Sequence, residues 1–168
     1  MIYGEQQKKE IETIRERTFK LRLSDADVKR LFEKAGEAGM SVSELLQNFI
    51  GDLVDGTYSN GSDERMYADQ WFDRCWFSPH GEPHSLLQRL SLYRGDLDET
   101  VYLWEEMQSL KEELEDEELE PEERADIEQQ IVWNKERYDD NIGSFTDPEE
   151  WQKVLAWNAE MKQMLTEE

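Results

Sequence analysis

The single Cys and the two His residues of this chain lie close together, in a spacing that could hold a metal ion. Cys75, His80 and His84 form the pattern Cys-x4-His-x3-His, and zinc favours such ligands. A structural zinc site takes four ligands, however, and the sequence holds no fourth Cys or His. Nothing marks a third group that would orient a Cys–His nucleophilic pair. The sequence therefore predicts no metal site, no cofactor and no catalytic residue.

Other enzymatic signatures are also missing. The chain has no Gly-rich phosphate loop, no zinc-protease or serine-hydrolase motif and no calcium loop. Carboxylates are plentiful, with 41 Asp and Glu in 168 residues, so pairs of them arise by chance. No pair stands apart as an acid–base couple. We expect a binding protein and not an enzyme.

Charge is the most unusual property of the composition. The formal net charge is −22, from 19 basic and 41 acidic residues. Residues 1–55 hold 9 basic and 11 acidic residues, whereas residues 56–168 hold 10 and 30. A field of this sign repels DNA from most of the second part and attracts basic surfaces. The acidic part is therefore expected to bind a basic partner.

The compartment follows from cysteine usage and hydropathy. A chain with one Cys cannot form an internal disulfide, which is typical of the reducing cytoplasm. No apolar run approaches the ~18 residues of a membrane-spanning helix. Residues 1–10 are polar and charged, unlike a secretory signal. We expect a cytoplasmic protein that does not enter a membrane.

The acidic residues are densest between Glu112 and Glu128, where eleven acids meet one base, Arg124. Such a run is commonly a solvated helical face that aids solubility. The alternative is that the carboxylates imitate the phosphate backbone of a nucleic acid and bind a basic protein. The residues predicted to make that contact are Glu112, Glu113, Glu115, Asp116, Glu117, Glu118, Glu120, Glu122 and Glu123.

Two helices are needed to position this run. Apolar residues recur at spacings of four and three before it, and a similar pattern follows it. Pro121 suits the first turn of the second helix, so the two helices are predicted to form an antiparallel hairpin with an acidic tip. The two series are Leu103, Met107, Leu110 and Leu114, and Ile127, Ile131, Asn134 and Tyr138.

The N-terminal part has a different pattern. Apolar and basic residues alternate over residues 19–23, Phe-Lys-Leu-Arg-Leu, which predicts a strand with Thr18 on the same face as the basic residues. Ser24 is a candidate N-cap for a helix, and Gly39 suits the turn that ends it. Ser41 and Glu44 have the spacing of a capping box at the start of another helix.

Phe-x-Leu-Arg-Leu-Ser, a helix, Ala-Gly-Met-Ser-Val-Ser and a second amphipathic helix resemble the ribbon-helix-helix family (Arc/MetJ-like). The resemblance covers residues 17–54. It implies a homodimer whose paired strands bind double-stranded DNA through residues 17–43. Thr18, Lys20 and Arg22 would read bases, and the amides of Ser41, Val42 and Ser43 would hold a phosphate. The alternative is a module that only dimerises.

The resulting fold prediction is a mostly α protein, with a ribbon-helix-helix of one short strand and two helices followed by an acidic helical domain. Residues 1–16 form a polar arm, which either lies along DNA or is disordered until bound. Residues 17–55 form the module, residues 56–63 a linker and residues 64–168 the acidic domain. That domain begins with an aromatic set that suits a core or dimer contact, or alternatively an exposed partner platform: Tyr67, Trp71, Phe72, Trp76 and Phe77.

Three functions fit these features. The first is an inhibitor similar in character to anti-CRISPR proteins of bacteriophages and mobile elements, whose acidic helices would occupy the basic nucleic-acid channel of an RNA-guided nuclease. The second is a ribbon-helix-helix transcriptional repressor. The third is an antitoxin whose C-terminal region binds a protein partner. The charge of residues 56–168 favours the inhibitor, because a repressor does not need it.

Overall fold

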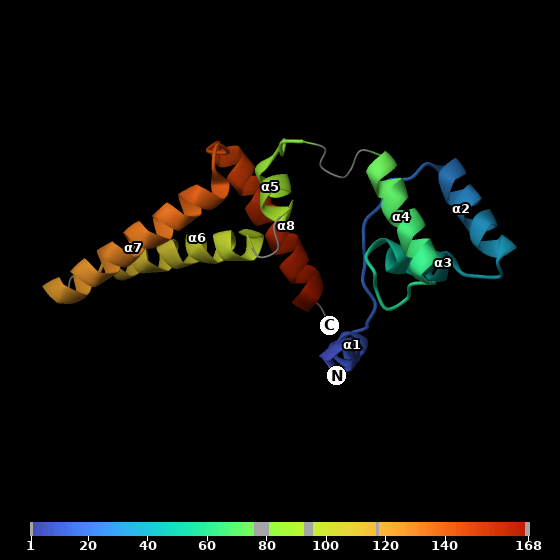
Figure 1. Ribbon diagram of the computed structural model, residues 1–168, viewed down its shortest axis with the longest axis horizontal. Helices are drawn as coiled ribbons and strands as arrows, with labels where there is room; N and C mark the ends of the chain where they lie inside the picture. Colours follow the sequence, from blue (N-terminus) through green and yellow to red (C-terminus); the bar gives the residue numbers. More distant parts are fainter. Residues whose placement is uncertain (1, 76–80, 93–95, 117, 167–168) are drawn as a thin grey trace. The chain divides into compact units, whose positions relative to one another are not determined.

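All regular elements that the computed structural model describes are α-helices (Figure 1); it describes residues 2–75, 81–92, 96–116 and 118–166. The chain divides into two compact units, Met1–Ser78 (unit 1) and Pro79–Glu168 (unit 2). The predicted helical character is thus confirmed. None of the described helices combines the length and apolar character that crossing a membrane requires.

Unit 1 consists of short helices, two of which begin at a serine N-cap. The Ser24 hydroxyl accepts a hydrogen bond from the amide of Asp27, and Ser41 and Glu44 form the predicted capping box. Gly39, after the first of these two helices, has a φ of 69°, which glycine adopts without strain. The elements are α1 (Ile2–Glu12), α2 (Asp25–Glu37), α3 (Val42–Leu53) and α4 (Ser62–Arg74); α3 packs against both α2 and α4.

The predicted strand is absent, and the prediction of a ribbon-helix-helix fold with a strand is therefore wrong. Residues 14–24 connect α1 to α2 without regular structure, and no strand occurs among the described residues. The alternation of residue types predicts only which residues would share one face of a strand, and not whether a strand forms. A strand also needs a neighbouring backbone to share its hydrogen bonds, and the described part of the chain offers none.

Unit 2 contains the hydrophobic core. Leu86 and Leu90 on one helix and Val154 on another are at most 1% exposed. Trp151 packs edge-on against Tyr138, with ring centroids 5.1 Å apart, and burial raises the pKa of Tyr138 to about 12. The elements are α5 (Leu86–Leu92), α6 (Asp96–Glu113), α7 (Pro121–Ile142) and α8 (Pro148–Thr166).

Two side chains fasten the helix ends of unit 2 to one another. The Glu150 carboxylate on α8 accepts a hydrogen bond of 3.0 Å from the amide of Leu86, at the start of α5. The Arg89 guanidinium on α5 donates a 2.7 Å bond to the carbonyl of Asn141, near the end of α7. Both contacts satisfy backbone groups that a helix end leaves without a partner. They hold α5, α7 and α8 together at the base of the α6–α7 hairpin.

Candidate interaction surfaces

Helices α6 and α7 run antiparallel as a long hairpin (Figure 1). Met107 and Leu110 from α6 and Ile127 from α7 are buried, as their spacing predicts. Along the edge of this seam, Arg137 pairs with Glu99 at 2.6 Å. A hairpin packed along this length carries its tip as a fixed structural element, well away from the core cluster formed by α5, α8 and the hairpin base.

The tip turn is closed by its only basic residue. The Arg124 guanidinium donates hydrogen bonds of 3.0 Å to the carbonyl of Leu114 and 2.9 Å to the carbonyl of Asp116. The Asp116 carboxylate in turn accepts a 2.9 Å bond from the amide of Glu118. The one positive charge of residues 112–128 is therefore bonded to backbone oxygens and pairs with no carboxylate in the described part of the tip.

The predicted partner-binding carboxylates lie on the surface of this tip. No ion pair involves them among the residues that the structure describes. Their charges are thus presented to solvent without a countercharge. Those that are described and exposed are Glu112, Glu113, Glu115, Asp116, Glu118, Glu120, Glu122 and Glu123; Glu117 lies outside the described residues.

The predicted base-reading residues lie in the irregular segment between α1 and α2. Thr18, Lys20 and Arg22 are all exposed, and Lys20 and Arg22 form no ion pair in the described chain. The neighbouring apolar side chains are exposed as well, with Phe19 at 66%. The structure therefore presents these three side chains to solvent, and the side-chain hydrogen bonds described at the start of α3 join Ser41 and Glu44 and none of these three residues.

The predicted phosphate site at the start of α3 is partly filled by the chain itself. The Glu44 carboxylate accepts a 2.8 Å hydrogen bond from the amide of Ser41. This bond, followed by the one from the Ser41 hydroxyl, holds the pKa of Glu44 below its usual value. The amides of Val42 and Ser43, in the first turn, have no partner within a helix. Only these two remain as candidate anion donors.

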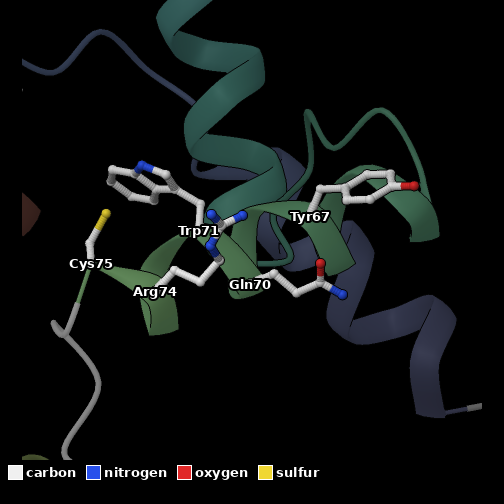
Figure 2. Close-up of a pocket in the computed structure, with 5 residues that line it drawn as sticks. All are labelled: Tyr67, Gln70, Trp71, Arg74 and Cys75. Carbon is white, nitrogen blue, oxygen red and sulfur yellow. The ribbon is translucent and has the colours of Figure 1, made fainter.

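Helix α4 carries part of the aromatic set for which the sequence predicts a core or dimer contact, or alternatively a partner platform. A hollow of about 380 Å³ lies along one face of α4, which is called the α4 face below. The side chains that line it, shown in Figure 2, come from α4 and from Cys75, the residue that follows the helix. Tyr67 is 64% and Trp71 is 44% exposed. The helical period fits an exposed face as well as a buried one, so the sequence alone could not decide. The lining residues are Tyr67, Gln70, Trp71, Arg74 and Cys75; Trp76 and Phe77 lie outside the described residues.

The connection between α3 and α4, expected to be a linker, is fixed by a buried carboxylate. Asp52 is 9% exposed and accepts hydrogen bonds of 2.6 Å from the amide and 2.9 Å from the side chain of Asn60. The Asn60 side chain is the main reason why the pKa of Asp52 is lowered. The compact units divide between Ser78 and Pro79, beyond α4. No sequence motif marks this Asp–Asn pair.

The metal pattern gains no support as a site. His80 lies outside the described residues, Cys75 is exposed, and the described residues hold no group of three potential metal ligands.

No protein-family model, curated protein or solved structure matches the chain.

Proposed function

We propose that the chain is a non-enzymatic inhibitor that uses the acidic tip of the α6–α7 hairpin to occupy a basic, nucleic-acid-binding surface of another protein. One observation carries this proposal: the described carboxylates of residues 112–128 are exposed and pair with no cation in the described chain. Solvated surface charges on stable proteins are usually mixed in sign. A single-sign tip on a packed hairpin suits recognition of the opposite sign.

Charge density supports a nucleic-acid mimic. Duplex DNA carries one charge per ~1.7 Å of its axis, and an α-helix rises ~1.5 Å per residue. The tip, with eleven acids in residues 112–128, approaches that density. RNA-guided nucleases hold their nucleic acids in positively charged channels. A CRISPR effector nuclease of this kind is therefore the proposed partner, in keeping with a phage or mobile-element anti-CRISPR-like role.

Unit 1 is proposed to contact double-stranded DNA through residues 17–43. Support comes from the exposure of Lys20 and Arg22, which have no acidic partner in the described chain. Phosphate contacts by such side chains supply most non-specific affinity. The remaining amides of Val42 and Ser43 add a helix N-terminus that suits a phosphate.

Self-association of unit 1 is the third part of the proposal. Large apolar side chains are exposed in the segment before α2, on α2 and at the end of α3, among them Leu21, Phe32 and Val54. A monomer in water rarely leaves so many uncovered. A homodimer would cover them and would place two acidic hairpins on one particle.

A transcriptional repressor is the second candidate, because exposed Lys20 and Arg22 serve DNA binding with or without the hairpin. In that case the acidic unit binds a protein partner of the repressor, as it would in an antitoxin. The two candidates differ in what the hairpin tip does. A repressor keeps its main activity when the tip changes, and an inhibitor loses it.

The test is competition for target DNA on a guide-loaded RNA-guided nuclease, measured by fluorescence polarisation. The variant Glu112→Lys/Glu115→Lys/Glu118→Lys should lose inhibition. A control, Asp98→Lys/Glu136→Lys/Glu160→Lys, makes the same change in net charge at exposed positions outside the tip and should keep it. Equal inhibition by both variants would refute the tip as the binding site.

DNA binding is tested separately with labelled random duplex at two salt concentrations. Lys20→Ala/Arg22→Ala should weaken binding and flatten its dependence on salt, while the helical content stays unchanged. Absence of binding by the unsubstituted protein at low salt would remove DNA from the proposal and leave the hairpin untouched.

A further inference from the structure

Unit 1 buries almost no apolar side chain of its own. Among its described hydrophobic residues only Ala35 and Ala68 are buried, at 1% and 6% exposure. The buried cluster of large residues belongs entirely to unit 2. A unit of this size needs a core of large side chains to offset the conformational entropy of folding. The described part of unit 1 therefore leaves much of its apolar surface in water.

The α4 face includes a ring contact with an exposed aromatic residue of α3. Trp71 meets Phe49 of α3 edge-to-face, with ring centroids 5.6 Å apart, and both rings remain more than 40% exposed. The bonds between Asp52 and Asn60 fix the connection from α3 to α4. Helix α4 is thus held on α3, and the side chains of Tyr67 and Trp71, labelled in Figure 2, remain partly exposed to solvent.

The area available suits an interface between proteins. A covered aromatic side chain buries ~150–250 Å², so the exposed parts of Phe32, Tyr67 and Trp71 offer roughly 300–400 Å². A stable interface buries about 800 Å² on each partner. These three residues therefore supply up to half of that area, and the exposed apolar residues between Phe19 and Val54 are further candidates for the contact. A small ligand in the hollow would leave most of them uncovered.

A second copy of the chain is the occupant that these observations favour. A surface that completes unit 1 must be present whenever the chain is folded, and a second copy of the chain meets this condition because it is always present in equal amount. Obligate homodimers have this property, with interfaces that resemble a core cut in half. Unit 1 carries 11 basic and 15 acidic residues, whereas unit 2 carries 8 and 26. Contact through unit 1 therefore avoids most of the repulsion between two acidic chains.

We propose that the α4 face, centred on Tyr67 and Trp71, is part of an interface between two copies of this chain. The inference rests on the proposed self-association of unit 1 and adds α4 to the surface that makes it. The aromatic rings of α4 lose their solvent in the dimer, and Gln70 and Arg74 lie at the polar edge of the contact.

Sedimentation velocity of the full chain over a range of concentrations tests this proposal. Tyr67→Lys places a charge on α4 without touching the Phe49–Trp71 contact, and it should weaken the dimer at least tenfold. Tyr102→Lys is the matched control, because Tyr102 of unit 2 is 60% exposed and the charge change is identical. Phe32→Lys tests self-association through α2. Circular dichroism verifies that each variant keeps its helices.

The outcomes separate the two levels of the proposal. A dimer that is weakened by Tyr67→Lys and unchanged by Tyr102→Lys supports the α4 interface. A dimer weakened by Phe32→Lys but not by Tyr67→Lys overturns the role of α4 and keeps self-association. A chain that sediments as a monomer at every concentration overturns both.

Discussion

The substitution Asp52→Asn removes the charge that fixes the connection between α3 and α4. Asp52 accepts two hydrogen bonds from Asn60, at 2.6 and 2.9 Å, while almost fully buried. Asparagine has the same shape, but its side-chain NH₂ group would face either the backbone amide or the side-chain NH₂ of Asn60, which are both donors. The Asn60 side chain can flip to meet it, yet the charge-assisted character of both bonds is lost. We expect local opening of residues 55–61 without unfolding of unit 2.

The magnitude follows from the kind of bond that is lost. Hydrogen bonds to a charged group contribute enough that losing one changes an opening equilibrium roughly 10- to 100-fold. Amide hydrogen exchange at Asn60, measured by NMR, should accelerate by about that factor. Asp55→Asn is the control: its ion pair with Arg65, at 2.9 Å, is exposed, and its φ of 53° suits asparagine. Exchange at Asn60 should barely change in that variant.

The pH dependence gives a second check on Asp52. Because hydrogen bonds from Asn60 lower its folded-state pKa, its contribution is complete above the unfolded pKa of ~3.9 and is lost as pH falls through the folded pKa. The difference between Asp52→Asn and the unsubstituted chain should therefore stay constant from pH 8 to 5. Equal exchange rates at Asn60 in both proteins at pH 7 would refute the assigned role of this carboxylate.

Three further substitutions test the packing of the two units. Glu150→Gln should lower the thermal midpoint of unit 2 by a few degrees at pH 7, because hydrogen bonds from Lys153 and then from the Leu86 amide lower the pKa of Glu150. The stability that this carboxylate contributes is complete above the unfolded pKa of ~4.3 and is lost in more acidic solution. An unchanged midpoint at pH 7 would count against this role. Leu90→Ala should cost unit 2 about 3–5 kcal/mol in denaturant unfolding, since Leu90 is 1% exposed. Gly51→Ala should loosen α4, because its Cβ would lie 2.5 Å from the carbonyl carbon of Tyr58, and faster exchange in residues 55–61 would report it.

Local signals in the sequence predicted local structure well. Ser24 and the Ser41–Glu44 box mark helix starts because a cap needs only residues three apart. The seam through Met107 and Leu110 followed from helical periodicity in the same way. The wrong prediction, the strand at residues 18–23, depended on a partner backbone. Periodicity carries no information about such a partner.

The sequence also did not predict contacts between distant residues at the candidate surfaces. The density of acids at the hairpin tip is visible in the sequence, but the bonds from Arg124 to the carbonyls of Leu114 and Asp116 are not, because only the folded turn brings these groups together. Trp71 has the same spacing whether it is buried or exposed. Asp52 was missed because its partner, Asn60, is eight residues away and belongs to a fold-specific turn.

The acidic tip also makes hairpin stability depend on its ionic surroundings. Glu112 and Glu113 lie at the C-terminal end of α6, where the helix dipole disfavours negative charge, and they repel the other acids of the turn. Dissolved ions screen this repulsion, most strongly between charges farther apart than the Debye length of about 8 Å at physiological ionic strength, so the hairpin should gain stability as ionic strength rises. A basic surface that binds the folded tip relieves the same repulsion. Recognition and local folding of the hairpin are then one linked equilibrium, in which a partner makes more rigid the element that it binds.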